Sequence, residues 1–140
     1  MKRRFLLASH GRLADGMHES VKIIIGKQDN ISTLCAYISS EKNLSQQVKE
    51  VINNLEYGEE LIVITDIFGG SVNNEFMKYI NYENLHIISS MCLPLVIELI
   101  TSQEESTEKL IEETIKNTQE NIKYCNKTFH TAKSIRDEEF

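Results

Sequence analysis

A chain of 140 residues is long enough for one domain with a single hydrophobic core, and its formal net charge is −6. The apolar and charged fractions, 41% and 26%, are ordinary for a globular protein and exclude a low-complexity or disordered chain. An acidic chain without a cluster of Lys and Arg excludes a nucleic-acid-binding surface, and no stretch is apolar for long enough to span a bilayer.

Short apolar runs alternate along the chain with segments of helical periodicity. The runs predict strands, and the periodic segments predict amphipathic helices between them. Pro94 suits the first turn of the helix that it begins. In chain order the predicted elements are a strand at 4–8, a helix at 13–25, a strand at 31–38, a helix at 44–55, a strand at 61–65, a helix at 72–80, a strand at 85–89, a helix from 94, and a long polar helix that ends near 124.

Two sequence pairs predict capping boxes at helix starts. Asn43 with Gln46 begins the helix at 44–55, and Ser102 with Glu105 begins the last helix. The predicted inward residues of that last helix are Leu110, Ile111, Ile115 and Ile122.

Residues 1–125, which contain all of these predicted strands and helices, are expected to form one domain. Residues 126–140 form a C-terminal tail, with weak strand character at 127–129 before disorder.

Strands that alternate with helices predict parallel pairing, with helices on both faces of the sheet. The connections between such strands are right-handed. We therefore predict a doubly wound, mostly parallel, flavodoxin-like α/β sheet. In that strand order the first and third strands are neighbours, and ligands bind where their carboxyl ends meet.

Two polar loops follow these neighbouring strands. Ser9-His10-Gly11 comes directly after the first strand, and the run from Asp66 to Ser71 comes directly after the third. Adjacent strands lie about 4.8 Å apart, so the imidazole of His10 and the carboxylate of Asp66 can hydrogen-bond.

This placement predicts a phosphoryl-transfer site. A neutral imidazole nitrogen is a nucleophile, and a carboxylate on the other ring nitrogen fixes the tautomer and stabilises the imidazolium. Gly69 and Gly70 let backbone N–H groups converge on an anion at the start of a helix. The predicted catalytic residues are His10 and Asp66, and the predicted phosphoryl-binding residues are Ser9, Gly69, Gly70 and Ser71. No Walker lysine or dinucleotide fingerprint is present, so a nucleotide donor held by this chain is not expected.

Each of these residues has an ordinary structural use when it is taken alone. A histidine after a strand commonly caps a loop, an aspartate does the same, and Gly69-Gly70 is typical of a tight turn. Only the meeting of His10, Asp66 and the glycine loop at one sheet edge favours a shared function.

The other residues of metal-binding type form no site pattern, and we expect neither a metal nor a cofactor. His18 is interpreted as a solvated or partner-facing side chain and His86 as a structural residue of the fourth strand, and His130 lies in the tail. The three cysteines are widely spaced, without a CxxC pair, and reduced thiols of this kind are typical of a cytoplasmic protein. They are Cys35, Cys92 and Cys125.

Three segments resemble a known family. The run from Phe5 to Met17 is similar to the start of mannose-family IIA domains of the bacterial phosphotransferase system (PTS). The run from Thr65 to Ser71 resembles their second active-site loop, and Leu93-Pro94-Leu95 resembles a third landmark. The resemblance covers roughly residues 3–125, and its first two motifs are specific only in combination.

The resemblance implies a doubly wound α/β sheet and a phosphohistidine carrier that takes part in sugar uptake. It implies that His10 accepts phosphate from the phosphocarrier protein HPr and passes it to a IIB component. The resemblance implies that this protein interacts with the membrane components IIC and IID only indirectly. Asp66 would orient the histidine and Ser71 would hold the phosphoryl group. It also implies a cytoplasmic homodimer in which a C-terminal strand crosses to the other subunit. The sugar stays unidentified, because IIA domains do not touch it.

One position departs from the family pattern. Val72 follows Ser71, where the family usually has proline, which predicts a looser start of the helix without loss of a donor. Asn74 falls where the family often has asparagine.

Two other IIA-like functions stay open. One is a regulatory module that senses phosphorylation, and the other is the IIA-like subunit that serves dihydroxyacetone kinase. His10 and Asp66 fit a carrier and a sensor equally well, whereas the run from Asp66 to Ser71 argues against the kinase subunit. The start at Met1, with no attached domain, favours a stand-alone carrier. A flavin-binding flavodoxin is disfavoured, because no hydroxyl-rich loop follows the first strand.

Overall fold

Residues 1–131 are described by the computed structural model, in two compact units. The first unit, Met1–Ile100, holds a four-stranded parallel sheet, and the second begins at Thr101. The strand order is β2-β1-β3-β4, so the first and third strands are neighbours, as the sequence predicted. The strands are β1 (Lys2–His10), β2 (Ile31–Ala36), β3 (Glu59–Thr65) and β4 (Leu85–Ile88).

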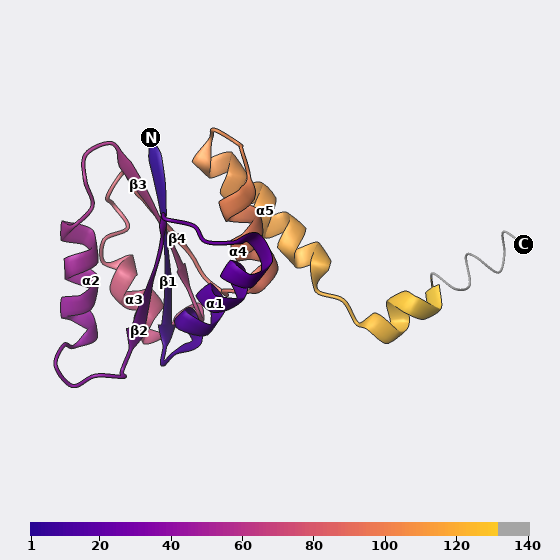
Figure 1. Cartoon of the computed structure of the whole chain (residues 1–140), viewed down its shortest axis with the longest axis horizontal. Coiled ribbons are helices and arrows are strands. Elements are labelled where there is room, and N and C mark those ends of the chain that lie inside the picture. The colour runs from indigo at the N-terminus through magenta and orange to yellow at the C-terminus, as the bar shows by residue number, and fades with distance from the viewer. Residues whose placement is uncertain (132–140) are drawn as a thin grey trace, which may run out of the picture. The chain divides into compact units, whose positions relative to one another are not determined.

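Helices cover both faces of this sheet, which confirms the predicted doubly wound α/β architecture. In Figure 1, α2 and α3 lie on one side of the strands, and α1 and α4 lie on the other. The helices of the first unit are α1 (Leu13–Ile25), α2 (Leu44–Asn53), α3 (Ser71–Met77) and α4 (Leu93–Thr101). The second unit contains α5 (Thr107–Asn121).

The core follows from the alternation of side chains along the strands. Successive strand residues point to opposite faces, and a parallel sheet buries both, which explains why its strands are almost continuously apolar. One face packs against the buried side chains of α2 and α3. That cluster consists of Leu6, Ala8, Leu34, Ala36, Val48, Ile52, Leu61, Val63, Val72, Phe76 and Leu85.

Strand boundaries differ from the prediction at charged and strained positions. β1 and β3 begin before their apolar runs because the parallel ladder continues through charged residues, and the Arg4 guanidinium pairs with Glu59 at 3.2 Å. β2 ends at Ala36 rather than at residue 38. The reason is Tyr37, whose φ of 66° leaves the extended region.

One of the two predicted capping boxes is confirmed. At the start of α2, Asn43 Oδ1 accepts a hydrogen bond from the Gln46 backbone N–H at 2.8 Å. The Gln46 side chain accepts one from the Asn43 N–H at 3.1 Å. This pattern needs only residues that are close in sequence, so it could be read without knowledge of the fold.

The prediction for the last helix was wrong at its start and along its inward face. Ser106 is the N-cap of α5, whereas Ser102 Oγ accepts a hydrogen bond from Glu104 N–H in a local turn. The physical reason is that α4 continues to Thr101, so the following residues are needed to turn the chain. Leu110 is buried as predicted, but Ile115 and Ile122 are 36% and 80% exposed.

The tail prediction also needs correction. Residues 125–131, which include the predicted strand at 127–129, are helical in the structure of the single chain. A helix satisfies its backbone hydrogen bonds internally, whereas a lone strand needs a partner edge. The rest of the predicted tail, 132–140, lies outside the described residues. Among residues 1–131, no helix has the length and apolar content needed to cross a membrane.

Candidate functional site

The two polar loops meet at one edge of the sheet. His10 is the last residue of β1, and Asp66 follows the last residue of β3. Because these strands are paired in parallel, with Ala8 opposite Thr65, both residues leave the sheet at the same edge. The predicted contact between His10 and Asp66 is therefore present.

Asp66 holds His10 through two hydrogen bonds. Its Oδ2 accepts from the His10 backbone N–H at 2.8 Å and lies 2.7 Å from the ring Nδ1. Its Oδ1 accepts from the Ile67 N–H at 2.9 Å. The Asp66 side chain is only 10% exposed, whereas that of His10 is 43% exposed. The carboxylate is thus a fixed internal group, and the imidazole is presented to solvent.

The protonation pattern follows from this geometry. Burial by itself raises the pKa of Asp66, but the hydrogen bonds and the charge of His10 outweigh it and bring the pKa below its ordinary value. An ionised carboxylate only accepts hydrogen bonds, so Nδ1 of His10 is the donor. In the neutral ring the lone pair is then on Nε2.

Ser71 lies on the other side of the imidazole. Its Oγ is 3.1 Å from His10 Nε2, and it accepts a hydrogen bond from the Tyr37 hydroxyl at 2.8 Å. Ser71 is the first residue of α3, so the helix start brings its hydroxyl to the nitrogen that carries the lone pair. Asp66 and Ser71 therefore occupy the two ring nitrogens of His10 separately.

The glycine loop leaves the space that this arrangement needs. Gly69 has a φ of +76°, which favours glycine, and a Cβ at Gly70 would lie 2.6 Å from Ile67 Cγ2 and 3.4 Å from His10 Cε1. The Gly70 N–H donates to the Ile67 carbonyl at 3.3 Å, so it does not point freely to an anion. Asn74 Nδ2 donates to the Gly69 carbonyl at 3.0 Å and holds the loop against α3.

Ser9 has a different place from the predicted one. It is fully buried, and its Oγ accepts from the Ala14 N–H at 2.8 Å and donates to the Gly11 carbonyl at 3.1 Å. Its hydroxyl is therefore occupied by the turn between β1 and α1. We assign Ser9 to holding the loop that carries His10, not to phosphoryl binding.

Two residues of the site region were missed by sequence reasoning. Tyr37 was placed inside a strand that was predicted to run to residue 38, although the carboxyl end of a strand next to β1 was a usable signal. Asn73 is 3% exposed, and its Oδ1 accepts from the Thr65 hydroxyl at 2.7 Å. That buried bond ties the end of β3 to α3.

The other histidines of the described chain lie elsewhere. His86 Nε2 is 2.8 Å from Glu60 Oε1, between β4 and β3, which fits the structural role that was predicted. His18 lies on α1, where burial lowers its pKa.

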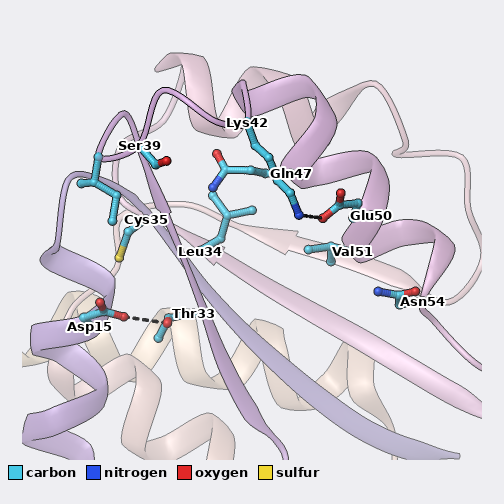
Figure 2. A pocket seen from close by; sticks show the side chains of 11 residues that line it. Asp15, Thr33, Leu34, Cys35, Ser39, Lys42, Gln47, Glu50, Val51 and Asn54 are labelled. Carbon is cyan, nitrogen blue, oxygen red and sulfur yellow. Dashed lines mark hydrogen bonds and ion pairs between the residues drawn. The ribbon is translucent and has the colours of Figure 1, made fainter.

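A pocket of about 450 Å³ lies beside β2 and α2 (Figure 2). Its lining does not include His10, Asp66 or Ser71. Asp15 accepts a hydrogen bond from Thr33 at 2.7 Å, and that bond lowers its pKa. Lys42 pairs with Glu50 at 2.9 Å on the pocket wall. These four groups are thus satisfied within the protein, and we assign the pocket no ligand.

Comparison with solved structures gives close matches over nearly the whole chain. A putative phosphoenolpyruvate-dependent sugar PTS permease from Klebsiella pneumoniae is 49% identical, with a TM-score of 0.89 over 92% of this chain and 95% of that one. A PTS IIA protein associated with the fucose utilization operon of Streptococcus pneumoniae is 27% identical, with a TM-score of 0.72 over 92% of this chain and 97% of that one.

A third match supports the fold alone. The mannose/sorbose-specific IIA subunit from Enterococcus faecalis is 24% identical, with a TM-score of 0.72 over 88% of this chain and 94% of that one. A family model, described as the PTS system fructose IIA component, matches residues 4–119. That range contains the His10 loop, the Asp66 loop and the Leu93-Pro94-Leu95 landmark, and it agrees with the resemblance seen in the sequence. The chain therefore belongs to the IIA components of the fructose and mannose type, a family with a phosphotransfer role in the sugar phosphotransferase system.

Proposed function

We propose that this protein is a phosphoryl carrier in which His10 accepts phosphate from phospho-HPr and passes it to a IIB component. The observation that carries the proposal is that the two ring nitrogens of His10 have different hydrogen-bond partners. Asp66 lies at Nδ1, Ser71 lies at Nε2, and the side chain is 43% exposed. An exposed nucleophile suits a reaction in which both donor and acceptor are other proteins.

The proposed transfer uses Nε2 as the nucleophile. Its lone pair forms the bond to phosphorus while the bond between phosphorus and the donor breaks, and the donor keeps that electron pair. The proton on Nδ1 stays in place, so the ring becomes an imidazolium whose charge Asp66 stabilises. The Ser71 hydroxyl then donates to a phosphoryl oxygen instead of Nε2. Transfer to a IIB acceptor runs through the same steps in reverse.

A labelled-phosphate experiment tests this function. Enzyme I, HPr and phosphoenolpyruvate should label the protein, and addition of the right IIB component should remove the label. Label that is taken up but passed to no IIB component would favour the regulatory module. Label that is not taken up at all would contradict both. Candidate IIB proteins are best chosen from those encoded by neighbouring genes.

Ser71→Ala and Gly70→Val should slow transfer to different extents. A lost hydrogen bond to a charged phosphoryl group costs about 1.5–3 kcal/mol, so Ser71→Ala should slow uptake roughly 10- to 150-fold. Gly70→Val should do more harm, because its Cβ would lie 2.6 Å from Ile67 Cγ2 and 3.4 Å from His10 Cε1. Single-turnover uptake from phospho-HPr measures both effects.

Gly16→Val is the matched control for Gly70→Val. Gly16 is exposed on α1, and a Cβ there has no atom within 4 Å. The Gly16→Val variant should transfer phosphate at the wild-type rate. Its melting temperature measures how much a valine in a helix changes the stability of the protein. Wild-type kinetics for both Ser71→Ala and Gly70→Val would remove this loop from the site.

We also propose that the protein is a homodimer. β4 is an edge strand of the described sheet, and such edges are usually covered. In the second unit, Ile122, Tyr124 and Phe129 are 80%, 73% and 65% exposed, which suits a segment that packs against a second copy. Light scattering at micromolar concentration should give a dimer, and deletion from Asn126 onwards should weaken it. A monomer whose mass and stability are unchanged by the deletion would contradict the proposal.

A further inference from the structure

Tyr37 has a backbone conformation that is costly for its residue type. Its φ of 66° places it in the left-handed region, where a bulky non-glycine residue is an outlier. Such a conformation persists where the surrounding structure requires it, and it often occurs at functional sites. The backbone just before it is held, because the Ala36 carbonyl accepts a hydrogen bond from the Gly11 N–H at 2.9 Å.

Burial does not explain this conformation. Tyr37 is 64% exposed, so burial of its ring contributes little free energy to offset the strain of its backbone conformation. Its contacts are instead with the candidate site. The hydroxyl donates to Ser71 Oγ at 2.8 Å, and the ring lies with its centroid 5.6 Å from that of His10. The positive φ at the end of β2 thus turns the side chain to the edge where His10 ends β1.

We propose that Tyr37 is a positioning residue for phosphoryl transfer and that it acts through Ser71. The inference rests on the proposed function of His10. The Ser71 hydroxyl has one hydrogen and can both donate and accept. Because the Tyr37 hydroxyl donates to Ser71 Oγ, the hydrogen of Ser71 is left to point to Nε2, and after transfer to a phosphoryl oxygen.

The arrangement is a directed chain of hydrogen bonds. It runs from the Tyr37 hydroxyl to Ser71 Oγ, from Ser71 to Nε2 of His10, and from Nδ1 of His10 to Asp66. Without the phenol, Ser71 is free to rotate, and its hydrogen is aimed at the phosphoryl group for a smaller part of the time. The role of Tyr37 is therefore to keep the Ser71 hydroxyl oriented as a donor to the phosphoryl group. Tyr37 itself need not contact the phosphate.

Tyr37→Phe removes the hydroxyl and keeps the ring that lies beside His10. One hydrogen bond between neutral groups is lost, so single-turnover uptake from phospho-HPr should slow about 3- to 10-fold. Tyr57→Phe is the matched control. Tyr57 is fully exposed and lies in the turn after α2, and its variant should transfer at the wild-type rate.

A double-mutant cycle with Ser71→Ala separates positioning from general damage. If Tyr37 acts through Ser71, then Tyr37→Phe slows the wild type but has almost no further effect on Ser71→Ala. An equal slowing in both backgrounds would overturn the proposal, as would wild-type kinetics for Tyr37→Phe. The ¹⁵N resonances of His10 give a second readout. In Tyr37→Phe the Nε2 resonance should move more than that of Nδ1, and no movement would count against the chain of hydrogen bonds.

Failure of this inference and failure of the proposed function give different results. If wild type takes up phosphate, His10→Ala does not, and Tyr37→Phe equals wild type, then the carrier function stands and the role of Tyr37 is overturned. If wild type itself takes up no phosphate, the proposed function has failed, and the role of Tyr37 in transfer fails with it.

Discussion

His10→Ala should reduce phosphate uptake from phospho-HPr to background. The substitution removes the imidazole whose Nε2 is the proposed nucleophile, and it leaves the neighbouring Ser71 hydroxyl without that nitrogen as a base. His10→Gln should be equally inactive, although it keeps a polar side chain of similar length. The adduct on the wild type should be labile to acid and stable to base, as expected of a phosphohistidine, and peptide mapping should place it on His10.

His130→Ala is the control for the loss of a histidine as such. His130 is exposed in the helical segment at 125–131 and should be dispensable for uptake. If His10→Ala still accepts phosphate at the normal rate, then His10 is not the acceptor and the proposed mechanism is wrong.

Asp66→Asn should fold and bind HPr but lose phosphoryl transfer by roughly two to four orders of magnitude. In the wild type both carboxylate oxygens accept hydrogen bonds, Oδ2 from His10 and Oδ1 from the Ile67 N–H. An amide has only one oxygen. Whichever way it is turned, its NH₂ group faces a donor, either the Ile67 N–H or the His10 N–H and Nδ1.

Two consequences for catalysis follow from the amide. If its NH₂ group faces Nδ1, the ring proton moves to Nε2 and the nucleophilic lone pair is lost. If its oxygen faces Nδ1, the tautomer is kept, but the imidazolium formed on attack has no charged partner. The ¹⁵N spectrum of His10 distinguishes these cases. Asp29→Asn is a matched control, since Asp29 is exposed just before β2, and it should transfer normally. Near-normal transfer by folded Asp66→Asn would require a different partner for His10.

The same carboxylate predicts a pH-dependent difference in stability. The pKa of Asp66 in the folded protein is lower than its ordinary value of 3.8. A lowered pKa stabilises the folded state above the unfolded-state pKa, and that contribution is lost as the pH falls through the folded-state pKa. The free energy of unfolding of wild type, relative to that of Asp66→Asn, should therefore decrease as the pH falls below about 4. Urea unfolding at several pH values between about 3 and 5 measures it, and a difference that grows as the pH falls through that range would contradict the assigned charge.

Much of the architecture was predictable because it depends on short-range patterns. Alternating apolar and amphipathic segments predicted the parallel sheet, and Asn43 with Gln46 predicted a cap that the structure confirms. The contact between His10 and Asp66 was also predictable, although they are 56 residues apart, because the parallel pairing of β1 and β3 brings both strand ends to one edge.

By itself, then, the sequence determined the fold class, the sheet edge where the candidate site lies and the pairing of His10 with Asp66. Only the tertiary structure decided that Nδ1 of His10 faces Asp66 and that Nε2 faces Ser71. It also showed that the Ser9 hydroxyl is hydrogen-bonded within a buried turn and that the Tyr37 hydroxyl binds Ser71. The reason is that strand order constrains where a backbone ends, whereas the direction of a side chain depends on its rotamer and on the backbone angles around it. A single φ of 66° at Tyr37 changed a predicted strand residue into a neighbour of His10, and no periodicity in the sequence records such an angle.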